Sequence, residues 1–284
     1  MTIRQKVGLE AEFLLINAKD EIIIPPSGWD RDGFPLLAEI RGTEGTTVAE
    51  TVTNFKAKEI EIVEDMRKGH TMRMSDVELI KLALYKKANK EIDWNEKEES
   101  MGKVKNIHGI DIEDFSDQVV KNNKIQGIRI SCGLHVHFSC GEERTFEHEE
   151  AQYEQVIIPV GLGEGALAEP TAVTPAYTLA KELLKPCMYL YRHKGYTKKG
   201  KTTIHASRLN KPAIEFIIEQ MDKAFFERFA APKAERTKFR QRGFYELKPY
   251  GFEYRSLPAN AQTMEALPEI TRKAFELLNE INAY

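Results

Sequence analysis

Residues 131–139 read Ser-Cys-Gly-Leu-His-Val-His-Phe-Ser, a stretch in which apolar and polar side chains alternate. In a β-strand, residues two apart point to the same face. One face therefore carries the imidazoles of His135 and His137, while leucine, valine and phenylalanine lie on the other. This pattern predicts a strand from about Ile125 to Cys140 that has one packed face and one polar face.

Three other stretches place charged residues on one strand face in the same way. Each has two charged residues separated by one apolar residue: Glu10-Ala-Glu12, Glu39-Ile-Arg41 and Glu253-Tyr-Arg255. A solvated face of an antiparallel sheet would explain any one of these strands. If all four strands lie in one sheet, however, glutamates face one another and repel unless positive charge lies among them. A divalent cation, or a pair of them, meets that need.

The residue types in this predicted cluster indicate which cation it would bind. A His-x-His pair alone suits zinc or copper, but here most of the partners are carboxylates. An oxygen-rich set of ligands favours Mg²⁺ or Mn²⁺. Because these ions commonly bind phosphates in proteins, we expect a nucleotide as the second component of the site.

The chain as a whole has the composition of an ordinary globular protein. It has 284 residues, 42% hydrophobic and 30% charged, and we expect a single domain over residues 1–284 with a helical or loop insertion around 66–124. The formal net charge of −3 gives no global attraction for nucleic acid. We find no leader peptide or membrane-spanning run, and the three cysteines are too few for a disulfide framework. These features favour a cytoplasmic protein, and they leave open whether it forms an oligomer.

Local patterns predict helices and strands at irregular spacing, which favours an α+β fold. Strands are expected at 4–16, 21–24 and 34–41, with a turn at 30–33 and a polar loop at 93–118. Helices are expected at 75–92, 145–160, 177–184, 210–230 and 264–281.

The order of these motifs resembles a known superfamily. The stretches GLEAE (8–12), AEIRG (38–42), GLHVHFS (133–139) and YGFEYRSLP (250–258) are similar to the glutamine synthetase-like carboxylate–amine ligases, most of all the phage-type COOH–NH2 ligase (amidoligase) family. The resemblance spans most of the chain but rests on about forty residues. It implies a curved antiparallel sheet, or half-barrel, with helices packed on its outer side. It also implies ATP-dependent amide formation through an acyl phosphate, from a small-molecule carboxylate and an amine.

The resemblance also implies a role for each site residue. Glu10, His135 and Glu253 would bind the metal nearer the nucleotide, and Glu12 with Glu39 the other metal. Arg255 would contact the transferred phosphoryl group, with Glu39 and Arg41 completing the catalytic set. Nucleotide or phosphate contacts would come from His137, Ser139, Arg240 and Arg242. The family's further glutamates have no assigned counterparts, although Glu50, Glu59 and Glu61 are candidates.

Three alternatives remain open from the sequence. Residues 195–202, GYTKKGKT, fit the P-loop pattern GxxxxGK[ST], which would indicate a nucleotide phosphohydrolase or kinase if a buried strand precedes it and a helix follows. His135, His137 and Glu142 fit the first motif of a cupin-like metal protein, although cupins are almost entirely β. A catalytically inactive binding domain on the same fold is the third alternative.

Overall fold

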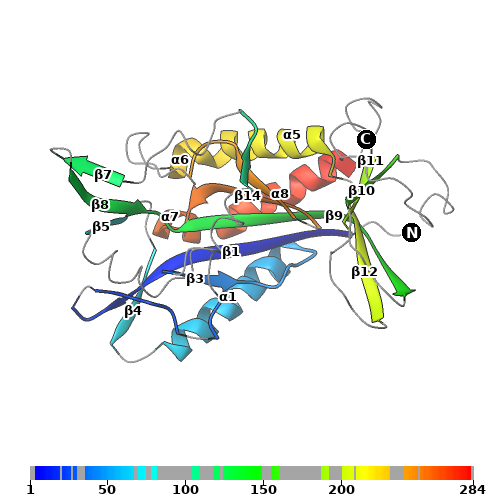
Figure 1. Ribbon diagram of the computed structural model, residues 1–284. Coiled ribbons are helices and arrows are strands. Elements are labelled where there is room, and N and C mark those ends of the chain that lie inside the picture. Colours follow the sequence, from blue (N-terminus) through cyan, green and yellow to red (C-terminus); the bar gives the residue numbers. More distant parts are fainter. Residues whose placement is uncertain are drawn as a thin grey trace.

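The described part of the chain forms a large antiparallel sheet, a small second sheet and a set of helices (Figure 1). This arrangement confirms the predicted α+β class, and the large sheet is open rather than closed into a barrel. The computed structural model describes residues 4–19, 21–26, 28–30, 36–66, 69–74, 78–81, 104–108, 118–121, 124–148, 155–159, 187–191, 200–207, 209–230, 240–248 and 250–282.

Strand β9 (Gly133–His148) is the centre of the large sheet. Its first half lies between β1 (Arg4–Asn17) and β14 (Gly251–Pro258), and its second half pairs with β12 (Gly200–Ser207). Strand β3 (Leu37–Arg41) pairs with β1. The order β3–β1–β9–β14 therefore makes the four strands with charged faces neighbours in one sheet. This is the condition under which their glutamates were expected to face one another.

The other strands extend the large sheet or form the small one. The large sheet also contains β2 (Ile22–Ile23), β4 (His70–Arg73), β6 (Val104–Asn106), β10 (Gln155–Pro159), β11 (Cys187–Tyr191) and β13 (Phe244–Lys248). The small sheet has the order β5 (Glu78–Lys81), β8 (Lys124–Ile130), β7 (Gln118–Lys121). Strands β4 and β6 come from the range 66–124 that was expected as an insertion, and both pair within the large sheet. The single-domain assignment stays a prediction.

Two of the predicted helices are wrong where the structure describes them. Residues 78–81, within the helix expected at 75–92, form β5, and the rest of that range lies outside the described residues. Within the helix expected at 145–160, residues 145–148 form the end of β9 and residues 155–159 form β10, and the others lie outside the described residues. In both places pairing with strands distant in sequence overrides the local pattern. The turn expected at 30–33 lies mostly, and the helix expected at 177–184 entirely, outside the described residues.

The strand expected at 125–140 and the loop expected at 93–118 also need correction. The strand is interrupted at Ser131 and Cys132, because β8 pairs with β5 and β7 in the small sheet whereas β9 joins the large one. Residues 104–106 of the expected loop form β6, which pairs with β13. An interruption of two residues thus separates two sheets that the alternation alone could not distinguish.

The predicted helices at 210–230 and 264–281 are confirmed. The first begins at Asn210, whose side chain accepts a hydrogen bond from the Ala213 amide, and the second corresponds largely to α8. The helices are α1 (Val48–Asp65), α5 (Lys211–Met221), α6 (Glu227–Phe229), α7 (Ala261–Glu265) and α8 (Leu267–Asn282), and a π-helical turn (Asp222–Phe226) joins α5 to α6. Helices α1 and α8 pack on β1, and α5 packs on α8 (Figure 1).

The hydrophobic core lies between this helical layer and one face of the large sheet. Leu9 of β1, Val136 of β9 and Tyr254 of β14 are buried on that face. Phe138 stacks on Phe252 across β9 and β14, with ring centroids 4.8 Å apart. Since successive strand residues alternate, burial of these side chains turns the charged residues of the same strands to the opposite face.

Candidate metal site

The register of the four neighbouring strands brings their charged residues face to face. Glu10 of β1 lies opposite Arg41 of β3 on one side and opposite His135 of β9 on the other. His137 of β9 lies opposite Glu253 of β14. We call the residues Glu10, Glu12, Glu39, His135, His137, Glu246 and Glu253 the carboxylate–histidine cluster.

His135 lies at the centre of the cluster and is fully buried. Its Nδ1 is 2.9 Å from Glu10 Oε1 and 2.8 Å from Glu253 Oε1, and its Nε2 is 3.5 Å from Glu12 Oε1. Burial and the charge of Arg255 act to lower the pKa of His135, but the surrounding carboxylates outweigh them and raise it. The ring therefore connects three carboxylates from two different strands.

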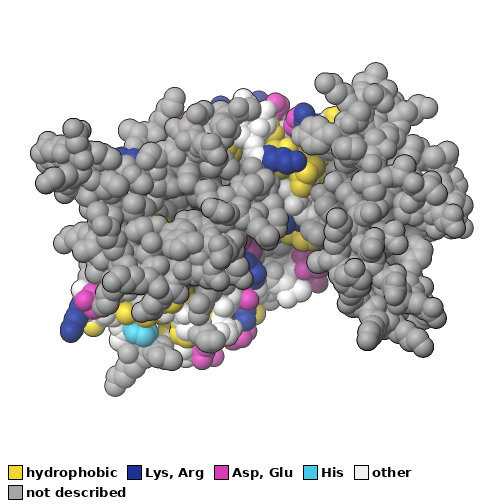
Figure 2. All heavy atoms as spheres, in the orientation of Figure 1, with side chains coloured by type: hydrophobic (Ala, Val, Ile, Leu, Met, Phe, Trp, Pro, Cys, Tyr) yellow, Lys and Arg dark blue, Asp and Glu magenta, His cyan; other side chains and the backbone are white. Residues whose placement is uncertain are grey.

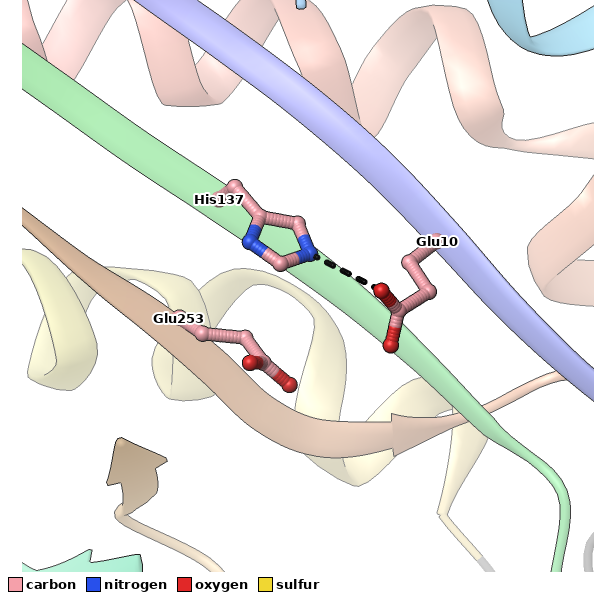
Figure 3. A group of neighbouring side chains, drawn as sticks. All are labelled: Glu10, His137 and Glu253. Atoms are coloured by element: carbon pink, nitrogen blue, oxygen red, sulfur yellow. Dashed lines mark ion pairs between the residues drawn. The ribbon is translucent and has the colours of Figure 1, made fainter. Parts of the chain in front are cut away.

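His137 belongs to a second group on the same face, nearer the surface. One ligand atom each from Glu10, His137 and Glu253 lies within 4.8 Å of the others (Figure 3). The Nε2 atom of His137 is 3.6 Å from Glu10 Oε2, and its Nδ1 is 2.5 Å from the Tyr250 hydroxyl. Because Tyr250 can accept a hydrogen bond from Nδ1, Nε2 can present its lone pair to a cation, the arrangement seen in many metal-binding histidines.

Positive side chains surround the carboxylates of the cluster. Arg41 Nε lies 2.9 Å from Glu10 Oε2, and the same guanidinium pairs with Glu39. Arg255 Nη1 lies 2.5 Å from Glu253 Oε1. Burial would raise the pKa of Glu253, but Arg255 and His135 hold it well below its usual value. Burial is likewise outweighed at Glu10, where the two histidines lower the pKa. Both carboxylates are therefore ionised at neutral pH.

The group formed by Glu10, His137 and Glu253 fits a divalent cation of the Mg²⁺ or Mn²⁺ type. Two carboxylates and an imidazole are ligands that these ions accept, Mn²⁺ the more readily. Two unit negative charges within 4.8 Å of each other repel by roughly 3 kcal/mol or more in a partly solvated site, and a bound cation would relieve this repulsion. Arg41 and Arg255, which pair with Glu10 and Glu253, relieve part of this repulsion.

The structure brings some predicted site residues together and leaves others apart. Arg240 pairs with Glu12 of the cluster, and Ser139 is half-buried on the same face of β9 as the two histidines. Arg242 is half-exposed, and its Nε lies 3.8 Å from Asp222, which binds Tyr254 from the helical side of the sheet. Arg242 is thus not brought to the cluster.

The unassigned glutamates lie on helix α1 rather than in the cluster. Glu50 accepts hydrogen bonds from Thr46 near the start of this helix. Glu59 and Glu61 pair with lysines of the same helix, three residues earlier in each case. All three glutamates therefore make local contacts on α1, in the helical layer, and none contacts the cluster through these interactions.

Three residues of the β13–β14 hairpin were missed. Glu246 lies opposite Glu253 and accepts a hydrogen bond from Arg255 Nη1 at 3.2 Å. Lys248 Nζ is 3.0 Å from Glu246 and 2.8 Å from Glu253, and Tyr250 contacts His137. The same period of two that identified Glu253 and Arg255 also relates Glu246 to Lys248, so the signal was present in the sequence.

Neither motif-based alternative is favoured by the fold. Residues 200–202 of the P-loop pattern begin strand β12, whereas a P-loop must be followed by a helix. The cupin interpretation requires an almost all-β barrel, but here helices cover one face of an open sheet.

Comparisons with known proteins give no family assignment. No family model, no curated protein and no solved structure matches the chain. None of the helices in the described part of the chain combines the length and the apolar character needed to span a membrane. On the face shown in Figure 2, acidic and basic side chains of the described residues are interspersed.

Proposed function

We propose that this protein is an ATP-dependent carboxylate–amine ligase that produces ADP. A carboxylate would be phosphorylated by ATP, and an amine would then displace phosphate from the acyl phosphate to give an amide. The observation that carries this proposal is the group formed by Glu10, His137 and Glu253, which has arginine and lysine directly beside it. Phosphoryl transfer from a metal-bound nucleotide requires ligands for the metal ion, and it requires positive side chains that neutralise the charge of the transferred group. The site offers both.

The residues of the cluster divide into two roles in this proposal. Glu10, His137 and Glu253 would hold Mg²⁺ or Mn²⁺, which when bound neutralises the phosphates of ATP. Arg255 would present its guanidinium to the transferred phosphoryl group, since it lies beside Glu253 with its side chain mostly buried. Arg41 and Glu39 would complete the catalytic set at the β3 edge, where the Arg41 side chain is about half exposed and pairs with Glu10 and Glu39.

The arrangement of the sheet supports the same proposal. The four motifs that carry the resemblance lie on adjacent strands, although they are far apart in the chain. We propose that the large sheet is the half-barrel of the glutamine synthetase-like ligases, with its helices on the outer side. Small-molecule carboxylates and amines are the proposed substrates, and the need for ATP favours a cytoplasmic location.

Calorimetric titration tests the proposal directly. A nonhydrolysable ATP analogue is titrated into the wild-type protein with and without Mg²⁺, and into Glu253→Gln. We expect binding that requires Mg²⁺ in the wild type and an affinity at least ~10-fold lower in the variant, as for loss of a metal ligand or its partner. Glu61→Gln, on the exposed side of α1, is the matched control and should bind like the wild type.

Two outcomes would contradict the proposal. One is the absence of Mg²⁺-dependent nucleotide binding in the wild type, and the other is equal binding by Glu253→Gln. If binding is observed, a screen of amines and carboxylates for stimulated ADP release identifies the substrates. ADP release that no amine or carboxylate stimulates would argue for a phosphohydrolase instead.

A further inference from the structure

Arg240 is a buried cation at the deepest carboxylate of the cluster. Its guanidinium pairs through Nη2 with Oε2 of Glu12, and the Gly133 amide donates to the same oxygen at 2.5 Å. The Arg240 side chain is 6% exposed and that of Glu12 is fully buried. Arg240 Nη1 also donates to the backbone oxygen of Arg255 at 3.4 Å. Contacts to β1 and β14 therefore fix this guanidinium in place.

Gly133 makes room for Arg240 at this position. A Cβ atom on residue 133 would overlap both the Arg240 guanidinium and the Nε2 side of the His135 ring. The guanidinium and Nε2 of His135 consequently lie on the same side of the β9 backbone, next to each other.

The remaining atoms of this region form an incomplete cation site. Glu12 Oε1 and His135 Nε2 are 3.5 Å apart, and neither has a hydrogen-bond partner among the described residues. An oxygen and an imidazole nitrogen at this separation could both bind one divalent ion. Arg240, however, lies beside them, and a guanidinium keeps its positive charge at all pH values that proteins tolerate.

We propose that Arg240 takes the place of a second divalent cation. The chain then binds one cation, at Glu10, His137 and Glu253, instead of the two that the resemblance implies. This inference rests on the proposed function, because it assumes that the group of Glu10, His137 and Glu253 binds a cation. Arg240 acts as a positioning residue here, since it neutralises Glu12 and leaves one place on this face for a metal.

Counting bound Mn²⁺ tests the inference without an activity assay. Electron paramagnetic resonance measures free Mn²⁺ during titration of the wild type, Arg240→Met and the matched control Arg242→Met. We expect one bound ion in the wild type, two in Arg240→Met and one in Arg242→Met, because Arg242 lies beside Asp222 on the other side of the sheet. Arg240→Lys keeps a positive charge and should also bind one ion.

A second substitution locates the additional ion. Adding Glu12→Gln to Arg240→Met removes the charge of the proposed ligand, so binding should return to one ion. Two ions in the wild type, or one in a folded Arg240→Met, would overturn the inference while leaving the proposed function intact. No bound ion in any variant would remove the cation site itself, and with it the proposed function.

A measurement in the wild-type background covers the case in which Arg240→Met does not fold. Glu12→Gln alone should keep one bound ion, with an affinity change below the ~10-fold expected for loss of a ligand or its partner. The neutral amide can still accept the Gly133 hydrogen bond. Loss of a bound ion in Glu12→Gln would show that Glu12 is a metal ligand and would contradict the inference.

Discussion

At the scale of single residues, His135 and His137 share a strand face but have different surroundings. The side chain of His135 is fully buried between carboxylates, whereas that of His137 is 18% exposed and lies beside Tyr250. The resemblance implies that His135 binds the metal and His137 contacts phosphate. The geometry places His137, not His135, in the group that can converge on one ion. His135 instead contacts both Glu10 and Glu253 through its Nδ1 atom.

Replacement of His137 tests this difference. We expect His137→Ala to lower the affinity for Mn²⁺ by ~10-fold or more, because a direct ligand is removed. Calorimetric titration of Mn²⁺ into the wild type and the variant provides the measurement. The matched control is Ser139→Ala, two residues further along the same face, which should leave the affinity unchanged.

His135→Asn completes the comparison. Loss of the buried ring should destabilise the fold by about 3–5 kcal/mol, because it removes one partner of Glu10 and one of Glu253, both of which are buried. If His137→Ala binds Mn²⁺ like the wild type and a folded His135→Asn does not, the roles implied by the resemblance are right and the assignment made from the geometry is wrong.

At the scale of elements, the π-helical turn 222–226 connects the helical layer to strand β14. Asp222 in this turn accepts a hydrogen bond from the Tyr254 hydroxyl at 2.7 Å. Tyr254 lies between Glu253 and Arg255, with its side chain on the opposite face. A π-helical turn inserts one extra residue into a helix, and such turns are common at functional sites. Here the turn contains Asp222, whose carboxylate binds β14, the strand that carries Glu253 and Arg255. Burial raises the pKa of Asp222 to about 6.

Asp222→Asn should change how stability depends on pH. The pKa of Asp222 is about 6 in the folded protein and 3.8 ordinarily, so the folded state keeps a proton that the unfolded state loses between these values. The free energy of unfolding of the wild type should therefore decrease as pH rises through this window. A difference of about two pKa units corresponds to about 3 kcal/mol. Asparagine does not titrate, so the variant should lack this decrease.

Urea unfolding at a series of pH values measures this effect. Glu10 and Glu253, whose pKa values are lowered, make the free energy of unfolding rise with pH instead. This rise takes place below their ordinary pKa of 4.5. Glu227→Gln, at an exposed acid on the neighbouring α6, is the matched control. It should retain most of the decrease, because the charge of Glu227 makes only a small contribution to the raised pKa of Asp222. The same decrease in Asp222→Asn would exclude Asp222 as its source.

At the scale of the whole molecule, the cluster connects strands that are distant in the chain. Glu10 and His135 are separated by 125 positions, and Arg240 and Glu12 by 228. A cation that binds Glu10, His137 and Glu253 would therefore connect β1, β9 and β14 and would bind only the folded state.

Thermal unfolding should consequently depend on the cation concentration. At an Mn²⁺ concentration ~100-fold above the dissociation constant, linkage predicts about 2.7 kcal/mol of stabilisation. For a chain of 284 residues the Tm should rise by roughly 4–6 °C. Differential scanning calorimetry with Mn²⁺, and again after addition of EDTA, measures this shift. His137→Ala, with its ~10-fold lower affinity, should show about half of this shift or less at the same Mn²⁺ concentration. An equal shift in that variant would place the bound ion elsewhere.

Local sequence patterns predicted the structure correctly where a single strand or helix forms from its own residue pattern. The alternation around Glu10, His135 and Glu253 correctly predicted which side chains share a face, and the apolar stripe of α8 predicted a long helix. Local patterns failed at 78–81, 145–148 and 155–159, because these residues pair with strands from elsewhere in the chain. The site residues Glu246 and Lys248 were missed although they follow the same alternation.

The sequence alone therefore determined the composition of the polar face, because a strand's period of two is a local property of the backbone. Only the tertiary structure decided which of these side chains meet. The strand register brings Glu10 opposite His135, and a shift of two residues would keep the same face but would bring Glu12 there instead. Register depends on packing of the opposite, apolar face against helices from both ends of the chain. That packing also brings Arg240 to Glu12, across most of the chain's length, and no local pattern contains that contact.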